Sequence, residues 1–510
     1  MRNDSGEERM TREPADNRLL TFQDVTLRIR DRHVLQSTQW QIDKGQQWVV
    51  LGPNGSGKST LVRAIAGLTP VVGGSILRHD PAAQTKAVGY LSFELLQSVV
   101  AREQARDEAR CFSGQLDQRM TVAQFMATVD RSTAAYSASI RRAISRLGLK
   151  RLLVRPLQSL SNGEMRKILI SRAALRSRGL LILDEPFDGL DSEAANVLGD
   201  AIQSWMQAGI HILLVTHRME EILPGFTHVI TLKDCKVVHA GLREQVLTPD
   251  NIKNIYGIEP EMVKNPKQVK VHPGAVSGAD AAVVIDVRNA CVRYGPTVVF
   301  DRLNWRVRQG EHWLITGPNG SGKTTLLQMV SGAHPQAYAN EVYLFGRRRG
   351  SGESVHEIKQ RVGLCSAEFQ INYRKSLRGL DVVLSGFFDS IGLYRQADQN
   401  QQKCADQWLD RLNLSHLREQ LFDNLSYGQR RSLLLARAVV KSPDILALDE
   451  PCQGLDPANR HKIIALLDDI CHNSSTQLIM VTHHGGDLPG CITHQLEMKT
   501  GKVTSNPRIV

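Results

Sequence analysis

Two glycine-rich loops, each ending in a lysine and a hydroxyl side chain, are the segments of this sequence best suited to chemistry. The segment from Gly52 to Thr60 recurs, with one change, from Gly317 to Thr325. Each follows a short apolar run and precedes a stretch with helical periodicity, the order of elements around a phosphate-binding loop. Glycine lets the backbone approach an anion closely, and the start of a helix favours negative charge. The two loops therefore predict two phosphate-binding sites.

Each loop also supplies side chains for a triphosphate and its cation. Lys58 and Lys323 place a positive charge on the terminal phosphates. Ser59 and Thr324 offer hydroxyls to Mg2+, which prefers oxygen ligands in an octahedral shell. The loop residues assigned to nucleotide binding are Gly52, Pro53, Asn54, Gly55, Ser56, Gly57, Lys58, Ser59, Thr60, Gly317, Pro318, Asn319, Gly320, Ser321, Gly322, Lys323, Thr324 and Thr325.

Two acid pairs stand at the ends of apolar runs, Asp184 with Glu185 and Asp449 with Glu450. Unbroken apolar runs are typical of buried parallel strands, and open α/β sheets bind ligands at the carboxyl ends of such strands. We expect Asp184 and Asp449 to hold Mg2+, and Glu185 and Glu450 to polarise an attacking water as general bases. A pair of surface acids at a strand end is the ordinary alternative, but it is improbable twice at one spacing.

Two histidines, His217 and His483, end a further pair of apolar runs. A lone histidine in such a place is most often structural. Beside two acidic strands, it is better interpreted as a contact to the γ-phosphate that responds to the nucleotide state. His484 is a weaker candidate for the same role.

A single long repeat accounts for all of these pairs. The offset of 265 residues holds for Lys58 and Lys323, Trp40 and Trp305, Trp48 and Trp313, Ser161 and Ser426, and Asp184 and Asp449, while His217 and His483 are 266 apart. A period this long indicates a duplicated domain rather than an array of small units. We predict a tail over 1–18, a first domain over 19–262, a Pro- and Gly-containing linker over 263–282 and a second domain over 283–510.

Composition limits the class of protein. Hydrophobic residues make up 42% and charged residues 23%, a balance typical of globular domains. Every apolar run is far shorter than the roughly 20 residues of a membrane-spanning helix, and the first residues lack the apolar core of a signal peptide. We therefore expect a cytoplasmic protein, whose membrane role, if any, needs a partner.

The net charge and the cysteine pattern limit which partners and cofactors the chain is expected to bind. The net charge of +11 favours anionic partners, although a solvated basic surface is preferred to a nucleic-acid face. Eight cysteines without a CxxC pair argue against zinc, an iron–sulfur cluster or a disulfide framework. They are expected to be mostly buried.

A third motif connects the two halves to a known family. Leu160-Ser-Asn-Gly-Glu164 recurs as Leu425-Ser-Tyr-Gly-Gln429, each before a basic helix with apolar periodicity. Serine at an N-cap followed by glycine leaves a helix start open to an anion. At these residues the chain resembles the ATP-binding cassette family, over nearly its whole length and with all three motifs in family order. Its LSGGQ signature is matched with Asn162 and Tyr427 at the third position, and with Glu164 at the fifth in one copy.

The resemblance implies an α/β fold of two P-loop nucleotide-binding domains, each with a RecA-like core, an antiparallel β region and a helical subdomain. It implies two ATP sites with Mg2+, each between the phosphate loop of one half and the signature of the other, so that ATP closes the halves and hydrolysis reopens them. The first site would join Lys58, Ser59, Asp184, Glu185 and His217 to Ser426 and Gly428, and the second Lys323, Thr324, Asp449, Glu450 and His483 to Ser161 and Gly163. Segments ending in Asp191 and Asp456 match the family's D-loop and should lie where the halves meet.

Departures from the family pattern bear on function. Tyr294 fits the aromatic residue that stacks on adenine, whereas the first copy has Ile29. The family's glutamine that links Mg2+ to a membrane partner is replaced by Phe93 and Ala367. Either Glu94 and Glu368, the acids that follow, take the place of this glutamine, or the coupling between the Mg2+ site and a membrane partner is altered.

The choice among cassette proteins rests on spacing and on segments outside the shared motifs. The loop lysine and signature serine are 103 apart in both halves, which leaves no room for a long coiled coil. Fused sugar-importer ATPases share this layout. Closer similarity to tandem ATPases associated with molybdate transport is seen in four segments, Tyr90 to Glu94, Pro186 to Asp191, Tyr343 to Gly352 and Phe387 to Gly392.

This resemblance implies an integral-membrane permease as partner and a peripheral place on the cytoplasmic face of an inner membrane. The alternative is a soluble regulatory or translation-linked tandem ATPase without a permease. Arg347, Arg348 and Arg349 either hold an anionic partner or form a solvated turn.

Overall fold

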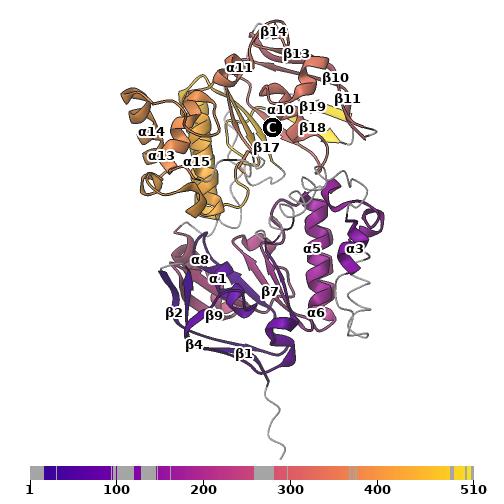
Figure 1. The fold of residues 1–510 in the computed structure, drawn as a ribbon, viewed down its shortest axis with the longest axis vertical. Coiled ribbons are helices and arrows are strands. Elements are labelled where there is room, and N and C mark those ends of the chain that lie inside the picture. Colours follow the sequence, from indigo (N-terminus) through magenta and orange to yellow (C-terminus); the bar gives the residue numbers. More distant parts are fainter. Residues whose placement is uncertain are drawn as a thin grey trace, which may run out of the picture.

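The computed structural model describes most of the chain. The described residues are 17–29, 32–92, 120–127, 147–160, 162–257, 281–295, 297–366, 376–482, 488–499 and 502–506, with 95, 99, 145, 369, 370 and 373. They form two halves with matching architecture, one indigo to magenta and the other orange to yellow in Figure 1.

The first half contains two sheets. An antiparallel sheet has the order β2 (Arg32–Asp43), β1 (Arg18–Ile29), β4 (Val71–Arg78). The core sheet has the order β5 (Val88–Leu91), β6 (Leu180–Asp184), β7 (His211–Thr216), β3 (Trp48–Leu51), β8 (His228–Lys233), β9 (Lys236–Leu242), and only β9 pairs antiparallel. The helices are α1 (Lys58–Ile65), α3 (Val122–Ala127), α5 (Asn162–Arg176), α6 (Ser192–Gln207), α7 (Arg243–Val246) and α8 (Pro249–Tyr256). Short 3-10 turns are η1 (Pro81–Ala83), η2 (Thr85–Ala87), η3 (Leu149–Leu152), η4 (Leu157–Ser159) and η5 (Met219–Glu221).

The second half repeats this plan. Its antiparallel sheet has the order β11 (Thr297–Arg308), β10 (Val283–Tyr294), β13 (Glu341–Leu344), β14 (Arg347–Arg348). Its core sheet has the order β15 (Val362–Cys365), β16 (Ile445–Asp449), β17 (Gln477–Val481), β12 (Trp313–Thr316), β18 (His494–Lys499), β19 (Lys502–Asn506), again with only the last strand antiparallel. The helices are α10 (Lys323–Val330), α11 (Val355–Arg361), α13 (Gly379–Leu384), α14 (Gln399–Arg411), α15 (Tyr427–Val439) and α16 (Pro457–Asn473). The 3-10 turns are η6 (Pro335–Ala339), η7 (Ser385–Phe388), η8 (Ser415–Leu417) and η9 (Phe422–Asn424).

The apolar runs of the sequence are the strands at the centre of each core sheet. Successive side chains of a strand point to opposite faces, and in β6 Leu181 and Leu183 join one hydrophobic core while Leu180 and Ile182 join another. All five residues of β6 and of β16 are buried. A strand covered on both faces needs an unbroken apolar run, which places its first polar residue at its carboxyl end.

The two halves face each other with their helical regions on opposite sides. In Figure 1 the layer of α13, α14 and α15 lies to the left of the upper half, and α3 and α5 lie to the right of the lower half. This is the arrangement of two similar bodies turned head to tail. The loops that follow β3 and β12 bond to the opposite half, so the carboxyl ends of these strands are directed toward the contact between the halves.

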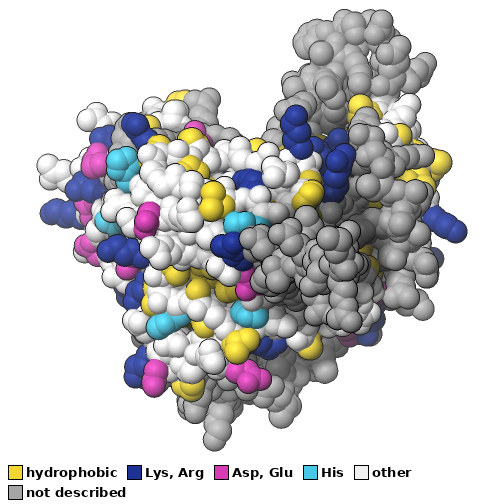
Figure 2. All heavy atoms as spheres, turned by 90° about the horizontal axis from the view of Figure 1, so that it is seen from below, with side chains coloured by type: hydrophobic (Ala, Val, Ile, Leu, Met, Phe, Trp, Pro, Cys, Tyr) yellow, Lys and Arg dark blue, Asp and Glu magenta, His cyan; other side chains and the backbone are white. Residues whose placement is uncertain are grey.

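The face of the molecule drawn in Figure 2 has no large patch of a single charge among its described residues. There the Lys and Arg side chains lie dispersed among acidic, hydrophobic and other polar side chains. On this face the arrangement agrees with a solvated basic surface. None of the helices in the described ranges is long and apolar enough to cross a membrane.

The helix after the first loop begins at Lys58, so the loop lysine already belongs to its first turn. Two local expectations need correction. Arg349 is only 2% exposed and pairs with Glu353 Oε1 at 3.0 Å, so it is a structural residue and not part of an anion-binding cluster. Of the described cysteines, three are buried (Cys365, Cys452 and Cys491) and four are half-buried (Cys235, Cys291, Cys404 and Cys471).

Glycine at one strand position allows each signature helix to lie directly on the core sheet. A β-carbon on Gly89 would stand 2.3 Å from Ala173 O in α5, and one on Gly363 would stand 2.2 Å from Ala438 O in α15. Both obstacles are backbone atoms, so a side chain would force the helix away from the sheet. The close spacing of helix and strand is thus possible because Gly89 and Gly363 have no side chain.

We expect Gly363→Ala to destabilise the second half by about 1–3 kcal/mol, as overpacking of a close contact does. Differential scanning calorimetry would record a lower unfolding temperature. Gly199→Ala in α6 is the control, because its β-carbon would lie 3.4 Å from Leu223 Cδ2 and alanine favours a helix. Equal melting of the two variants would contradict the close-packing argument.

Candidate active site

The two glycine-rich loops adopt the same compact form. A β-carbon on Gly52 would lie 2.3 Å from Leu232 O, and one on Gly317 would lie 2.1 Å from Met498 O. Both glycines also have positive φ, 159° and 142°. Only glycine fits at this point, where the chain leaves the central strand and turns over its neighbour. The hydroxyls of Ser56 and Ser321 are buried and make no hydrogen bond within the described ranges.

The loop lysines are held inside their own loops. Lys58 Nζ donates to Gly52 O at 2.8 Å and to Pro53 O at 3.0 Å, and Lys323 Nζ donates to Gly317 O at 2.7 Å and to Pro318 O at 2.9 Å. Burial lowers the pKa of both amines, although the neighbouring carboxylates oppose it. Each loop thus holds a buried ammonium group in the cup formed by its backbone.

The glutamates that follow β6 and β16 are held in a backbone conformation that is rare for residues other than glycine. Glu185 has φ 53° and Glu450 has φ 52°. Their N–H groups donate to Val215 O and Val481 O, each at 2.9 Å. A left-handed residue turns its side chain away from the strand direction, and such strain is concentrated at functional sites. The same conformation at both positions therefore supports a shared functional role.

In the first half, Glu185 and His217 are in direct contact. His217 is 1% exposed, and its Nδ1 lies 2.6 Å from Glu185 Oε2. Burial would raise the pKa of Glu185, but His217 outweighs it, with help from Lys58 and Arg218, and lowers the pKa to about 2. The carboxylate is therefore charged and available as a hydrogen-bond acceptor at every physiological pH.

A second carboxyl next to this pair behaves in the opposite way. Glu221 accepts a hydrogen bond from Thr216 Oγ1 at 2.5 Å, and burial raises the pKa of Glu221 to about 7 despite the charges of Arg218 and His217. Both acids are desolvated, but the nearby cations outweigh desolvation at Glu185 and do not at Glu221, so the pKa values of the two shift in opposite directions.

In the second half, the described contacts centre on Thr324 and Asp449. Thr324 Oγ1 donates to Asp449 Oδ2 at 2.7 Å. Burial raises the pKa of Asp449, against the hydrogen bond from Thr324. This hydroxyl and carboxylate form an oxygen-only ligand pair of the kind that Mg2+ prefers. In the first half Asp184 is buried, with Tyr90 Oη 3.5 Å from its Oδ2, and Ser59 is exposed.

The two D-loop aspartates join the halves through identical pairs of hydrogen bonds. Oδ1 of Asp456 accepts from Asn459 N and caps α16, while its Oδ2 accepts from Asn54 N of the opposite phosphate loop, both at 2.9 Å. Oδ1 of Asp191 caps α6, and its Oδ2 accepts from Asn319 N at 2.9 Å. The prediction that these segments lie where the halves meet is confirmed.

Other groups reinforce this contact. Asn54 Nδ2 donates to Gly454 O at 2.6 Å, and Asn319 Nδ2 donates to Gly189 O at 3.3 Å. A β-carbon on Gly189 would stand 2.5 Å from Gln453 Nε2, so the two D-loops also touch each other. Each phosphate loop is thereby fixed to the other half by backbone and side-chain bonds.

The second signature motif lies against the first phosphate loop. Ser426 caps α15 in a capping box with Gln429, and a β-carbon on Gly428 would lie 3.1 Å from Asn54 Nδ2. The reverse pairing is only partly visible, because Ser161 lies outside the described residues. No atom of the described residues lies within 4 Å of a β-carbon added to Gly163, and Glu164 pairs with Arg155 Nη1 at 3.0 Å.

One predicted residue has described contacts outside the loops, and others lie outside the described residues. Tyr294 Oη is hydrogen-bonded to His334 Nε2 at 2.7 Å and lines a pocket with Gln328, Pro335 and Phe369, none of them loop residues. Its stacking on adenine stays a prediction. His483, His484, Phe93, Glu94, Ala367 and Glu368 lie outside the described residues.

Sequence reasoning missed Arg431. This residue of α15 is completely buried, and its guanidinium donates to Glu450 O at 2.7 Å and to Asp449 O. It ties the signature helix to the end of the acidic strand in its own half. The signal for it was the repeat itself, since Arg166 stands 265 residues earlier as a second buried arginine on a helix with apolar periodicity.

We expect Asp456→Ser to loosen the contact between the halves without loss of fold, because serine still caps α16 but has one oxygen only. A hydrogen bond to a charged group contributes about 1.5 kcal/mol, so loss of the bond to Asn54 N should make the backbone amides of 52–60 exchange with deuterium about tenfold faster. Hydrogen-exchange mass spectrometry measures this. Asp398→Ser, at the N-cap of α14, is the matched control; exchange at wild-type rate in Asp456→Ser would show that this bond does not hold the loop.

Comparison with known proteins agrees with this geometry. A family profile described as ABC transporter matches residues 35–188 and 300–453. The chain is 38% identical to the "ABC transporter ATP-binding protein ModF" of Escherichia coli (strain K12), over 92% of this chain and 95% of that protein. It is 27% identical to an uncharacterised ABC transporter ATP-binding protein of Schizosaccharomyces pombe, over 92% and 96%.

A solved structure shares the fold of both halves. The crystal structure of the archaeal ribosome recycling factor aABCE1 with the ribosomal stalk protein aP1 matches with a TM-score of 0.58 and 18% identity, over 93% of this chain and 87% of that one. At this identity the likeness concerns the fold alone. Both family matches include a phosphate loop and an acidic strand. The chain therefore belongs to the ABC transporter family, and it carries two of the family's ATPase domains in tandem.

Proposed function

We propose that this chain is the ATP-hydrolysing subunit of an ABC transport system, associated with molybdate transport, with two composite ATP sites between its halves. The observation that carries the composite sites is the pair of D-loop bonds, from Asp456 to Asn54 and from Asp191 to Asn319. They place each phosphate loop against the opposite half. A nucleotide bound by one loop would then be covered by the other half.

The hydrogen-bond donors of the two phosphate loops are suited to bind a triphosphate. Ser56 and Ser321 each present a buried hydroxyl with no hydrogen bond within the described ranges, and a buried polar atom of this kind needs a partner. Lys58 and Lys323 hold their ammonium groups on backbone carbonyls of the same loop. When a triphosphate binds, those bonds are exchanged for bonds to phosphate oxygens, which favour the charged amine.

The remaining roles follow the chemistry of each side chain. Mg2+ would be held by Thr324 and Asp449 in one site and by Ser59 and Asp184 in the other, and it supplies charge neutralisation to the phosphates. Glu185 and Glu450 accept the proton of the attacking water. His217 orients Glu185 through their 2.6 Å contact, and His483 takes the same role in the second site. Ser426 and Gly428 cover the first nucleotide, and Ser161 and Gly163 the second.

Replacement of both glutamates should abolish turnover. We expect Glu185→Gln with Glu450→Gln to lower ATP hydrolysis by about 100-fold or more, the typical contribution of a general base, while ATP binding remains. Each single variant should retain at most about half of the wild-type rate if the two sites contribute equally. Phosphate release and nucleotide binding are measured on the same preparations.

The control is Glu193→Gln, which changes an exposed glutamate of α6 in the same half. It should hydrolyse ATP at the wild-type rate. Hydrolysis at the wild-type rate in both single variants and in the double variant would remove the base role from Glu185 and Glu450.

The transport role is supported by the relative named ModF, which matches over almost the full length of both chains. Because none of the described helices spans a membrane, the transport step would be made by a separate permease. The double variant, held in the ATP-bound state, is the form most suited to capture that partner from detergent-solubilised membranes of its own organism.

We expect an integral-membrane protein to co-purify with the double variant in ATP, and cells lacking the chain to accumulate less molybdate when molybdate is scarce. Mass spectrometry identifies the first, and elemental analysis of washed cells the second. Glu193→Gln without trapping should capture less permease. Unchanged molybdate content, with no membrane protein captured, would count against the transport role.

The replacement of the family's glutamine by Phe93 and Ala367 favours a second candidate, a soluble regulatory or translation-linked tandem ATPase. That glutamine normally links the Mg2+ site to a membrane partner, so its absence from both halves weakens the case for a permease. ATP-dependent co-sedimentation with ribosomes, in the same fractionation, would favour this candidate.

A further inference from the structure

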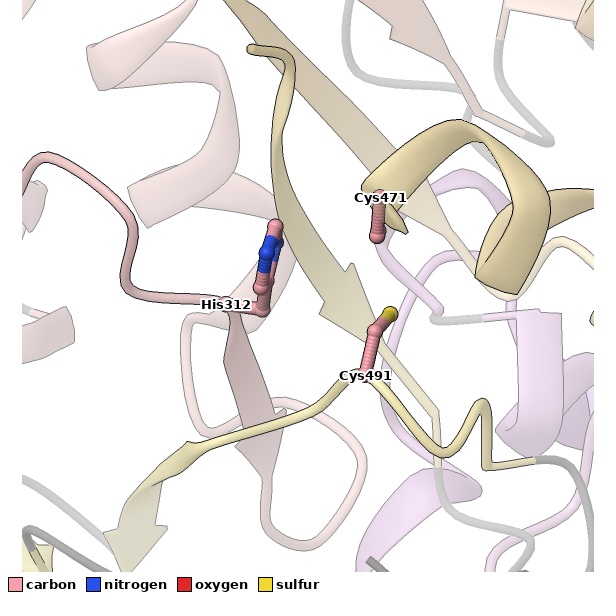
Figure 3. Close-up of side chains that lie close together, drawn as sticks. All are labelled: His312, Cys471 and Cys491. Carbon is pink, nitrogen blue, oxygen red and sulfur yellow. The ribbon is translucent and has the colours of Figure 1, made fainter. Parts of the chain in front are cut away.

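Three side chains that no ATP-site role uses converge in the second half. Figure 3 shows His312, Cys471 and Cys491 directed toward one another from the start of β12, the end of α16 and the segment that leads into β18. Their ligand atoms all lie within 4.8 Å of one another. This cluster is at the amino ends of the parallel strands, the edge of the sheet opposite to the phosphate loop that follows β12.

Hydrogen bonds that involve backbone N–H groups fix two members of the cluster, Cys491 and His312. Cys491 N donates to Asp468 Oδ1 at 2.9 Å. Asp468 and Cys471 are three residues apart and so share one face of α16, which brings Cys491 over Cys471. Leu478 N donates to His312 Nδ1 at 3.1 Å, so the ring is held in place by the start of β17.

The hydrogen bond from Leu478 N to His312 Nδ1 bears on whether the cluster is a metal site or a reactive thiol site. A neutral histidine whose Nδ1 accepts a hydrogen bond carries its proton on Nε2. A metal-ligating histidine usually donates its second ring N–H to a neighbour instead. His312 is therefore arranged to donate a hydrogen bond to sulfur rather than to ligate a metal. The contacts with Cys491 and with His312 lower the pKa of Cys471 against the effect of desolvation, whereas the contact with Cys471 raises the pKa of Cys491.

The first half shows that the fold does not need these residues. Gln47 stands 265 residues before His312, and its side chain makes the equivalent bond, accepting from Ile212 N at 2.6 Å. The same offset along the helix puts Met206 at the place of Cys471. Gly225 precedes β8 as Cys491 precedes β18, and its β-carbon would lie 2.7 Å from Met206 Sδ. The site thus exists in both halves, and only the second carries thiols.

We propose that Cys471 and Cys491 are a redox-active thiol pair, oxidised to an intramolecular disulfide by small-molecule disulfides, with His312 as the positioning residue that holds Cys471 as the attacking thiolate. Cys471 is half-buried, whereas Cys491 is buried, so Cys471 is the more exposed of the two thiols. The bond would tie the end of α16 to the segment before β18. Because Asp456 is the N-cap of α16, the helix so fixed is the one whose capping residue contacts the opposite phosphate loop.

The reaction balances with one equivalent of disulfide. The Cys471 thiolate attacks RSSR, forms a mixed disulfide and releases RS−, which takes up the proton that Cys471 lost. The Cys491 sulfur, on losing its proton to solvent, attacks Cys471 Sγ and releases the second RS−, which is protonated in turn. Two thiols lose two electrons, and RSSR becomes two RSH.

Alkylation of the reduced full-length chain with iodoacetamide tests the thiolate. Near pH 6, Cys471 should react about tenfold or more faster than Cys404, even after allowance for the weaker nucleophilicity of an acidic thiol. Cys404 is a half-buried cysteine whose pKa burial raises, so it is the matched control. His312→Gln, which installs the residue of the first half, should move the pH midpoint of Cys471 upward and leave Cys404 unchanged. Equal rates at Cys471 and Cys404 would overturn the proposal.

Peptide mapping after incubation with oxidised glutathione tests the pair. The wild-type chain should yield a Cys471–Cys491 disulfide that dithiothreitol reverses, and Cys491→Ser should stop at glutathionylated Cys471. A mixed disulfide in the wild-type chain that Cys491 never resolves would sink the idea. A second outcome would also overturn the proposal. If Co2+ binds stoichiometrically in excess Mg2+ with thiolate-to-cobalt absorption, and if Cys471→Ser or His312→Gln abolishes that absorption, the cluster is a metal site.

Discussion

The contact between the halves depends on two aspartates that each use both carboxylate oxygens. In Asp456 and in Asp191 one oxygen caps a helix of its own half and the other accepts from the phosphate loop of the opposite half. A carboxylate has enough acceptor sites for two such bonds. The helix start is thereby oriented by the same group that binds the other half, so movement of α6 or α16 and movement of the opposite loop are linked.

The two halves share this frame but differ in what surrounds it. In the first half Glu185 is charged beside His217, and a desolvated Glu221 lies next to them. In the second half the described contacts are Thr324 with Asp449, and Arg431 with the carbonyl of Glu450. One signature helix begins with a capping box, whereas in the other Glu164 pairs with Arg155. Duplication preserved the backbone geometry of the sheet ends, and the halves differ in sequence at neighbouring side chains such as Glu164 and Gln429.

The thiol cluster follows the same logic at the opposite edge of the second sheet. A position whose side chain accepts a hydrogen bond from a strand N–H is filled by Gln47 in one half and by His312 in the other. Both satisfy the backbone, but only the histidine adds a donor that faces two cysteines. Additional chemistry can therefore arise at a structural position without any change in the fold.

By itself the sequence determined the duplication, the two glycine-rich loops, the acids that end the central strands and the D-loop seam, and the fold confirms each of these as a structural feature. The physical reason is that they are local: a buried strand must be apolar until it ends, and a loop that turns as tightly as Gly52 does must contain glycine. Only the tertiary structure decided what depends on distant segments. It paired Glu185 with His217, buried Arg431 beneath Glu450, removed Arg349 from the surface, and brought His312 to Cys471 and Cys491. No spacing rule joins residues that meet only because three separate elements end at one edge of a sheet.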